Sequence, residues 1–328
     1  MTKSSPRIGI IGLGTIGKTH IKTWQANGIT PVAFADAIPA ALEATVAEHG
    51  GDAFADGLDL IHSGQIDIVS VCTPPAFHRD LVIAALETGV AVLCEKPMAR
   101  TLEDAQAMVD VAEWTGTLFS VGFCHRFQPH IEKLKELIDM RELGTVMSMR
   151  NRFAGHKKDV EKTWFANPRI AGGGVLADTS VHSIDTFRYL IGEPVGVHAF
   201  ASTRQTDLGP ALEVDDTAVL TLQTADGTIG VIESSWRTPP GEWSFTIYGT
   251  KGTATFDYDT LKLGIASPYG DMRVIDVEPG DRFTREFAHF LACWRGEEQL
   301  RVTPADGLAA NRILDAAYRS AQAPTLLD

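Results

Sequence analysis

A glycine-rich turn near the start of the chain has the spacing of a phosphate-binding loop. Gly12, Gly14 and Gly17 follow an apolar run at 7–11 and precede a helix-like stretch. Gly12 can take a tight turn, Gly14 lets backbone N–H groups approach a pyrophosphate closely, and Gly17 lets the helix pack on the strand. The helix N-terminus adds partial positive charge. The turn therefore indicates a dinucleotide site.

An acidic residue supports the same interpretation. Asp36 lies nineteen residues past Gly17, at the end of a second predicted strand at 31–35. A carboxylate there can accept hydrogen bonds from the adenosine ribose hydroxyls. Its charge would repel the 2′-phosphate of NADP, and no Lys or Arg follows it through His49, so NAD is favoured over NADP. The alternative is that Asp36 only caps the following helix.

A lysine occupies a position where it could act on a substrate oxygen. Glu95, Lys96 and Pro97 directly follow an apolar strand at 90–94. Open α/β sheets bind their ligands at the carboxyl ends of their strands. A partly desolvated lysine there could hydrogen-bond a reacting hydroxyl or carbonyl and share in proton transfer. The alternative is a surface lysine before a helix-starting proline.

A second polar cluster falls within a helix predicted at about 174–190. Asp178 and His182 are four residues apart, so they share a helix face, and Asp185 follows three residues later. Histidine can accept an alcohol proton, and a neighbouring carboxylate can orient its ring. The pattern leaves three interpretations open: an acid–base unit, a pair on the helix surface, or a divalent metal site.

The elements that carry these residues differ between the two halves of the chain. Over roughly the first 120 residues, apolar runs alternate with helix-like stretches, which predicts a parallel sheet with helices on both faces. Strands are predicted at 7–11, 31–35, 66–72, 90–94 and 118–121. Helix ends are marked by Gly28 and Gly89 as stops, Pro39 as a start, and Thr101 with Asp104 as a capping pair.

After Arg126 the pattern changes. A helix is predicted at about 129–140, and alternating β-branched and aromatic segments between 195 and 277 are separated by turn signals. This stretch predicts an antiparallel sheet. Two helices, near 282–295 and 304–321, are expected to close the chain.

Size and composition set further limits. The chain has 328 residues, enough for two domains, which we place at 1–124 and 125–328. Hydrophobic residues make up 44% and charged residues 22%, as in ordinary soluble proteins. A net charge of −13 works against phosphate-backbone binding, so no nucleic-acid partner is expected.

The cysteines and the N-terminal sequence bear on the compartment. Cys72, Cys94, Cys124 and Cys293 lack the close pair spacing of zinc sites or redox dithiols, so reduced buried thiols are expected. The N-terminal sequence has no apolar segment of the secretory type, and no stretch approaches a membrane span. We therefore expect a cytoplasmic protein without a membrane partner.

Several motifs resemble those of the Gfo/Idh/MocA oxidoreductases, over nearly the whole chain. The resemblance implies an α/β fold: an N-terminal Rossmann domain with a doubly wound parallel sheet, then a C-terminal α/β domain with a large open, mostly antiparallel sheet. It also implies a homodimer or homotetramer built on that second sheet. The motifs are the glycine loop, Cys72 to His78, Cys94 to Ala99, Gly122 to Phe127, and Gly172 to Asp185.

The resemblance also implies roles for individual residues. Lys96, Asp178 and His182 match a catalytic trio in which His182 is the base, Lys96 assists at the substrate oxygen and Asp178 orients and tunes. His125, Arg126 and Asp185 match positions that face the substrate. No metal is implied. The positions expected to bind the cofactor are Gly12, Gly14, Thr15, Ile16, Gly17, Asp36, Thr73, Pro74, His78 and Glu95.

One departure from the family pattern is visible, because Ser180 stands where many members have glycine. The expected activity is NAD-dependent oxidation of a secondary hydroxyl of a sugar, a cyclitol or a related polyol. The alternatives are an NAD-dependent glycosidase that oxidises its substrate transiently, and a catalytically silent NAD-binding sensor. The presence of both Lys96 and His182 favours the dehydrogenase.

Overall fold

The computed structural model describes residues 5–323 and divides into two compact units. The first unit joins the residues up to Cys124 with Asp281–Asn311, and the second joins His125–Gly280 with the residues from Arg312 onward. One break between the compact units follows Cys124. Residues 281–311 pack with the first unit, and the domain bounds 1–124 and 125–328 stay a prediction.

The first unit is built on a six-stranded sheet in which every neighbouring pair is parallel. The spatial order is β3-β2-β1-β4-β5-β6, so β2 and β3 are added on one side of β1 and β4 to β6 on the other. This confirms the predicted doubly wound parallel sheet. Its strands are β1 (Ile8–Ile11), β2 (Ala33–Ala35), β3 (Asp52–Phe54), β4 (Ile68–Val71), β5 (Ala91–Cys94) and β6 (Phe119–Val121).

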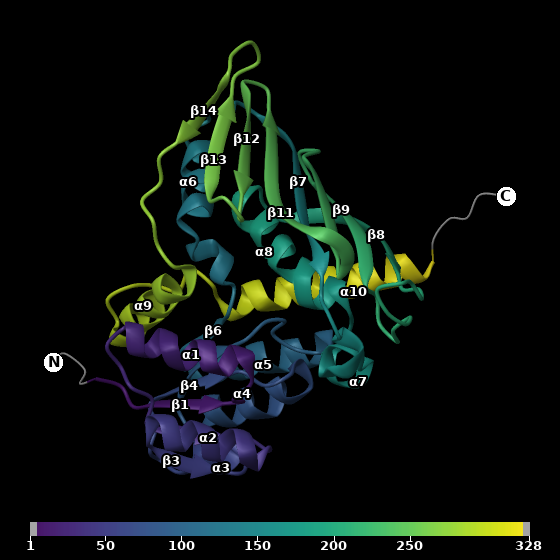
Figure 1. Cartoon of the computed structure of the whole chain (residues 1–328). Coiled ribbons are helices and arrows are strands. Elements are labelled where there is room, and N and C mark those ends of the chain that lie inside the picture. Colours follow the sequence, from purple (N-terminus) through teal and green to yellow (C-terminus); the bar gives the residue numbers. More distant parts are fainter. Residues whose placement is uncertain (1–4, 324–328) are drawn as a thin grey trace. The chain divides into compact units, whose positions relative to one another are not determined.

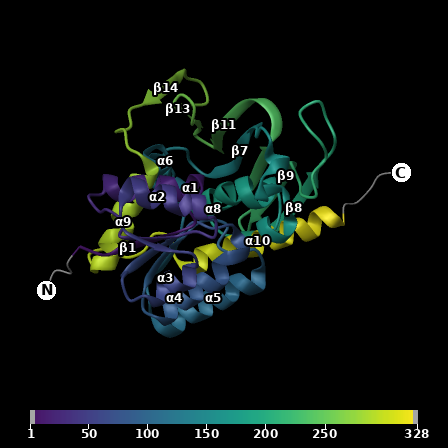
Figure 2. The same ribbon diagram turned by 60° about the horizontal axis from the view of Figure 1, so that its bottom comes forward.

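Helices cover both faces of this sheet. α1, α2 and α9 share one apolar core with the strands, while α3, α4 and α5 lie side by side, as Figure 2 shows. Two of these helices begin as predicted. Thr101 caps α5 by accepting a hydrogen bond from Asp104 N, and Pro39 is the first residue of α2. The helices are α1 (Thr15–Ala26), α2 (Pro39–His49), α3 (Gly57–His62), α4 (His78–Glu87), α5 (Leu102–Thr115) and α9 (Arg282–Arg295).

Helix α9 belongs to the first unit for a simple packing reason. Phe287 and Phe290 are fully buried in the core that contains Trp24 of α1. The rings of Phe287 and Trp24 are 4.8 Å apart. Burying two aromatic side chains contributes several kcal/mol, enough to attach a C-terminal helix to the N-terminal sheet.

The second unit is built on an eight-stranded sheet, drawn mainly in teal and green in Figure 1. Its order is β14-β13-β12-β11-β7-β10-β9-β8, and every pair is antiparallel except β7 with β10. The predicted mostly antiparallel sheet is therefore confirmed. Its strands are β7 (Val146–His156), β8 (Pro194–Ser202), β9 (Thr217–Thr224), β10 (Ile229–Ser235), β11 (Arg237–Gly249), β12 (Gly252–Asp257), β13 (Lys262–Ala266) and β14 (Met272–Ile275).

Helix α8 (Val181–Leu190) packs against β7 and β10. A Cβ at Gly230 of β10 would lie 2.6 Å from the ring of Phe187, so this glycine is what admits the buried phenylalanine. The chain enters α8 through a π-helical turn, Leu176–Ser180, where we expected one continuous helix from about 174. The other helices here are α6 (Pro129–Asp139), α7 (Pro168–Ala171) and α10 (Pro304–Gln322), whose first turns belong to the first unit.

The described part of the chain also settles two smaller points. All four cysteines are free and buried, as predicted, and burial raises the pKa of each thiol, that of Cys293 to about 11. Between residues 5 and 323, each helix is too short or too polar to span a membrane.

Candidate active site

The glycine loop has the geometry that its spacing predicts. Gly12 adopts a φ of +91°, and a Cβ there would lie 2.7 Å from the backbone of Cys72. A Cβ at Gly17 would lie 1.9 Å from the carbonyl oxygen of Gly12. A Cβ at Gly14 would meet nothing within 4 Å. Gly12 and Gly17 are therefore required by the packing of the loop itself, whereas Gly14 faces open space that a pyrophosphate could use.

The Asp36 carboxylate accepts hydrogen bonds from both the glycine loop and the residue at the start of α2. Its Oδ2 accepts a hydrogen bond of 2.7 Å from Leu13 N, and its Oδ1 accepts one of 2.8 Å from Ile38 N. Ile38 is the cap position of α2, so Asp36 supports the helix start from two residues before it. A carboxylate has further acceptor capacity on both oxygens, so these bonds are compatible with ribose binding.

Thr73 and His78 lie after β4, where cofactor contacts are expected. Within residues 5–323, the Oγ1 atom of Thr73 is buried and has no hydrogen-bond partner, as expected of a group that meets a ligand. His78 is fully buried, with Nε2 2.8 Å from Thr73 O and Nδ1 3.2 Å from Pro97 O. Burial lowers the pKa of His78, against the effect of these carbonyl groups. His78 thus holds the loops after β4 and β5 together, and Pro74 caps the short turn between Thr73 and His78.

Glu95 anchors the loop that carries Lys96. Its Oε1 is 3.0 Å from Nε2 of His20, and its Oε2 accepts from Lys96 N at 3.1 Å. Desolvation disfavours the Glu95 carboxylate, but His20 and Lys96 outweigh it, and the pKa of Glu95 lies below its ordinary value. Lys96 itself is only partly buried. The sequence analysis did not identify His20. Its only indication was its position on the helix that follows the glycine loop.

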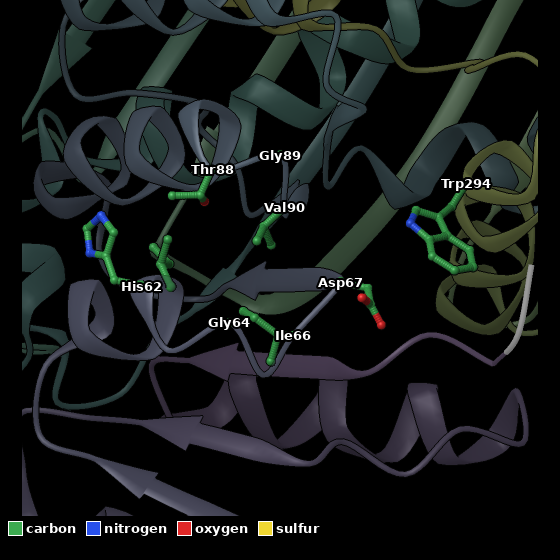
Figure 3. A pocket seen from close by; sticks show the side chains of 9 residues that line it. His62, Gly64, Ile66, Asp67, Thr88, Gly89, Val90 and Trp294 are labelled. Atoms are coloured by element: carbon green, nitrogen blue, oxygen red, sulfur yellow. The ribbon is translucent and has the colours of Figure 1, made fainter.

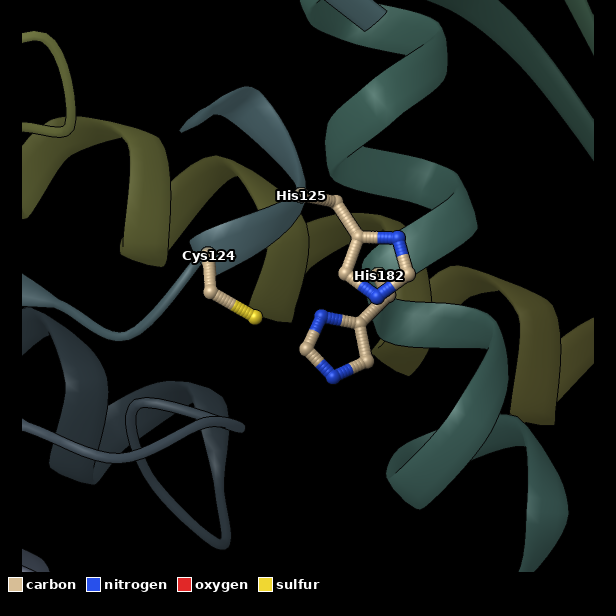
Figure 4. Close-up of side chains that lie close together, drawn as sticks. All are labelled: Cys124, His125 and His182. Carbon is tan, nitrogen blue, oxygen red and sulfur yellow. The ribbon is translucent and has the colours of Figure 1, made fainter. Parts of the chain in front are cut away.

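In the second unit, His182 stacks on His125. Their ring centroids are 4.4 Å apart and their planes differ by 22°. Figure 4 shows His182 on α8 and His125 directly after Cys124 in the chain. His125 Nδ1 is in turn 2.8 Å from the hydroxyl of Tyr258. The ring of His182 is therefore held by a second imidazole that has its own fixed partner.

Arg126 and Asp185, both predicted to face the substrate, form a buried ion pair with each other. Arg126 Nε and Nη2 donate to the two carboxylate oxygens of Asp185 at 2.9 and 2.6 Å. The side chain of Asp185 is 1% exposed. This bidentate pair fixes α8 to the segment that carries His125. Direct substrate contact by either residue stays a prediction.

Asp178 lies in the π-helical turn and pairs with a residue that sequence reasoning missed. Lys157, just past the end of β7, places its Nζ 3.1 Å from Asp178 Oδ2. Ser180, the departure from the family pattern, donates to Ser234 of β10 at 2.8 Å and is buried. The buried hydroxyl therefore has a hydrogen-bond partner in the sheet.

The three glycines before this turn permit close approach of other chain segments. A Cβ at Gly174 would lie 1.8 Å from the backbone oxygen of Asp215, and one at Gly173 would lie 2.0 Å from the hydroxyl of Tyr318. The Asp215 carboxylate accepts from Gly174 N at 2.9 Å and from Leu176 N at 2.8 Å. Tyr318 donates to the same carboxylate at 2.9 Å. Asp215 and Tyr318 therefore fix the start of the turn that presents Asp178.

A separate groove of about 450 Å³ lies in the first unit (Figure 3). Its lining includes Gly64, Ile66 and Asp67, which precede β4, and Gly89, which precedes β5. It is therefore at the amino ends of these strands, whereas Thr73 and Lys96 follow their carboxyl ends. The groove is distinct from the candidate site.

Comparison with known proteins gives a consistent result. Residues 6–123 match the profile of an oxidoreductase family with an NAD-binding Rossmann fold, and residues 131–255 match that of a GFO/IDH/MocA C-terminal domain. An inositol 2-dehydrogenase of Rhizobium meliloti (strain 1021) is 31% identical, and the match covers 96% of each chain. The chain belongs to the GFO/IDH/MocA family.

Two further relatives support this assignment. A levoglucosan dehydrogenase of Pseudarthrobacter phenanthrenivorans is 31% identical over 81% of this chain and 78% of its own. A levoglucosan dehydrogenase structure in complex with NADH and levoglucosan has a TM-score of 0.88 and 27% identity, and covers 96% of this chain and 97% of its own. These relatives are named dehydrogenases, in agreement with the match of this chain to an oxidoreductase family with an NAD-binding Rossmann fold.

Proposed function

We propose that this protein is an NAD-dependent dehydrogenase that oxidises a secondary hydroxyl of a cyclic sugar, a cyclitol or a related polyol. The proposal depends mainly on one observation: Lys96 follows the carboxyl end of β5 in an NAD-binding Rossmann sheet and is held there by Glu95. The names of the relatives, which include inositol and levoglucosan dehydrogenases, support the substrate class.

The residues after β1, β2 and β4 fit a dinucleotide. The open space at Gly14 suits a pyrophosphate, and the unpartnered hydroxyl of Thr73 suits a further cofactor contact. We propose NAD rather than NADP because the Asp36 carboxylate would repel a 2′-phosphate. The cofactor-binding set is Gly12, Gly14, Thr15, Ile16, Gly17, Asp36, Thr73, Pro74, His78 and Glu95, with His78 acting by holding the loops that carry its neighbours.

The chemistry divides between the cofactor and the protein. Oxidation of a secondary alcohol to a ketone removes one hydride and one proton, and bound NAD supplies the hydride acceptor. In the proposed mechanism His182 takes the hydroxyl proton, and the Lys96 ammonium donates a hydrogen bond to the same oxygen. Asp178 orients and tunes the histidine. The stack on His125 limits rotation of the His182 ring, which keeps its nitrogen atoms in position.

Alanine substitutions test this mechanism. Lys96→Ala and His182→Ala should each lower kcat by roughly 10²–10⁴-fold, the usual range for general acid–base catalysis. NAD affinity should stay nearly unchanged, because neither side chain is needed for the glycine loop or Asp36. Lys251→Ala, which removes an exposed lysine, serves as the control. Near-normal turnover in either active-site variant would refute the assignment.

We also propose that the protein forms a homodimer or homotetramer through the second sheet. Large apolar side chains on several strands of this sheet are exposed, which is unusual for a surface without a partner. Light scattering coupled to size-exclusion chromatography would test it, and a monomer at micromolar concentration would contradict it. The exposed residues include Met147, Val195, Phe200, Val219, Ile229, Trp243 and Val274.

A further inference from the structure

Lys157 lies in an unusual environment within the second unit. Its Nζ is 3.1 Å from the ring centroid of Phe165 and 4.8 Å from that of Trp236, besides the 3.1 Å to Asp178 Oδ2. Two-thirds of the side chain is buried, since its exposed fraction is 32%. A cation over aromatic faces is stabilised by their quadrupoles, and more strongly when it is partly desolvated.

Further contacts connect Lys157 to its surroundings. Its backbone N donates to Trp236 O at 3.0 Å, which continues the pairing beyond the end of β7. The indole Nε1 of Trp236 donates to Thr179 Oγ1 at 3.2 Å, and that hydroxyl is 3.4 Å from Asp178 Oδ2. The lysine, the indole and the Asp178 turn are therefore connected by direct contacts.

From this geometry we propose that Lys157 is a positioning residue of the active site, whose ammonium keeps the Asp178 carboxylate ionised and in place for its action on His182. The inference rests on the proposed function and adds a residue to it. An opposite charge within about 4–6 Å favours the ionised form of a carboxylate. The side chain of Asp178 is 19% exposed, so solvent screening is reduced but not abolished.

Two further titratable groups of the second unit lie near this turn, His182 and Asp215. His182 follows on α8, and the Asp215 carboxylate is bonded to Leu176 N at the start of the turn. A further carboxylate cannot neutralise Asp178, and His182 is the group that Asp178 is proposed to tune. Removing the Lys157 charge should therefore alter the acid limb of the pH profile, a change that a purely structural lysine would not cause.

The test compares Lys157→Met with Lys158→Met. Methionine keeps an unbranched side chain that is one atom shorter and removes the charge, and Lys158 is the exposed neighbouring lysine. In Lys157→Met the acid limb of kcat/KM should move to higher pH by about one unit, with a lower kcat. Lys158→Met should keep the wild-type profile. An unchanged acid limb in Lys157→Met would overturn the proposal.

A second measurement does not depend on turnover. Thermal unfolding of Lys157→Met, Asp178→Asn and the double variant forms a cycle that reports the coupling of the pair. We expect the double variant to lose less Tm than the two single losses added together. Additive losses would overturn the proposal even if the enzyme is inactive on every sugar tested. Inactivity of the wild type together with coupled losses would instead refute the proposed function and retain the ion pair.

Discussion

Tyr318→Phe tests how the active-site turn is held, because it removes a single oxygen atom. In the wild type this hydroxyl donates to Asp215 Oδ1 at 2.9 Å and accepts from Gly174 N at 3.0 Å. In the variant Gly174 N keeps its hydrogen bond to Asp215, so this backbone donor still has an acceptor. The loss is one hydrogen bond to a charged group, about 1.5–3 kcal/mol. For a unit of this size, that corresponds to a fall in Tm of roughly 3–12 °C.

The same change should affect turnover. Asp178 follows Gly174 by one turn, so loosening the Asp215 contact should misplace it, and small misplacements cost up to roughly 100-fold in rate. The KM for NAD should not change, because the cofactor loops belong to the first unit. Differential scanning fluorimetry and steady-state kinetics measure these effects, with the fully exposed Tyr269→Phe as control. A Tm and a kcat equal to those of the control would refute the reasoning.

Three further predictions follow from the first unit. Gly14→Ala adds a methyl group to open space, so Tm should be unchanged while NADH affinity falls at least tenfold, whereas Gly17→Ala puts its methyl group 1.9 Å from a backbone oxygen and should lower Tm. Wild-type NADH affinity in Gly14→Ala, measured by fluorescence titration, would contradict the placement of the pyrophosphate. His20→Ala leaves the buried Glu95 carboxylate without its imidazole partner and should cost roughly 3 kcal/mol in urea unfolding; a loss near zero would contradict that pairing. Burial lowers the pKa of His78 below 6.5, so beneath that pH the unfolded chain binds a proton that the folded chain does not. The free energy of unfolding should therefore fall below pH 6.5, by at most about 1.4 kcal/mol per pH unit, and less steeply in His78→Asn; parallel curves would contradict this.

Local patterns were sufficient to predict most of the first sheet. Buried parallel strands appear in sequence as short apolar runs, and five of the six strands in this sheet were found in that way. β3 was missed because Asp52–Phe54 is short, begins with an acidic residue and lies at the sheet edge, where its first two residues are exposed. The positions of Asp36 and Lys96 at strand ends were predictable, because Asp36 directly follows β2 and Lys96 lies two residues past the end of β5.

The partners of the site residues could not be predicted in the same way. His20 and Glu95 are 75 residues apart, and Lys157 and Asp178 are 21 apart. Such pairs are created by the packing of elements, and no local spacing marks them. The π-helical turn before α8 was missed because the residues from 174 onward fit an α-helical pattern equally well. The packing of helix α9 with the first unit could not be predicted, because its apolar face does not show which core it joins.

The central claim is that a sugar or cyclitol hydroxyl is oxidised with net transfer of hydride to NAD. The most direct measurement is NADH absorbance with a panel of inositols, aldoses and anhydrosugars, with glycoside release followed in parallel. We expect NADH to accumulate with at least one cyclic polyol or sugar, and to disappear in Lys96→Ala and His182→Ala. Glycoside release without NADH accumulation, or no cofactor reduction with any member of the panel, would contradict it.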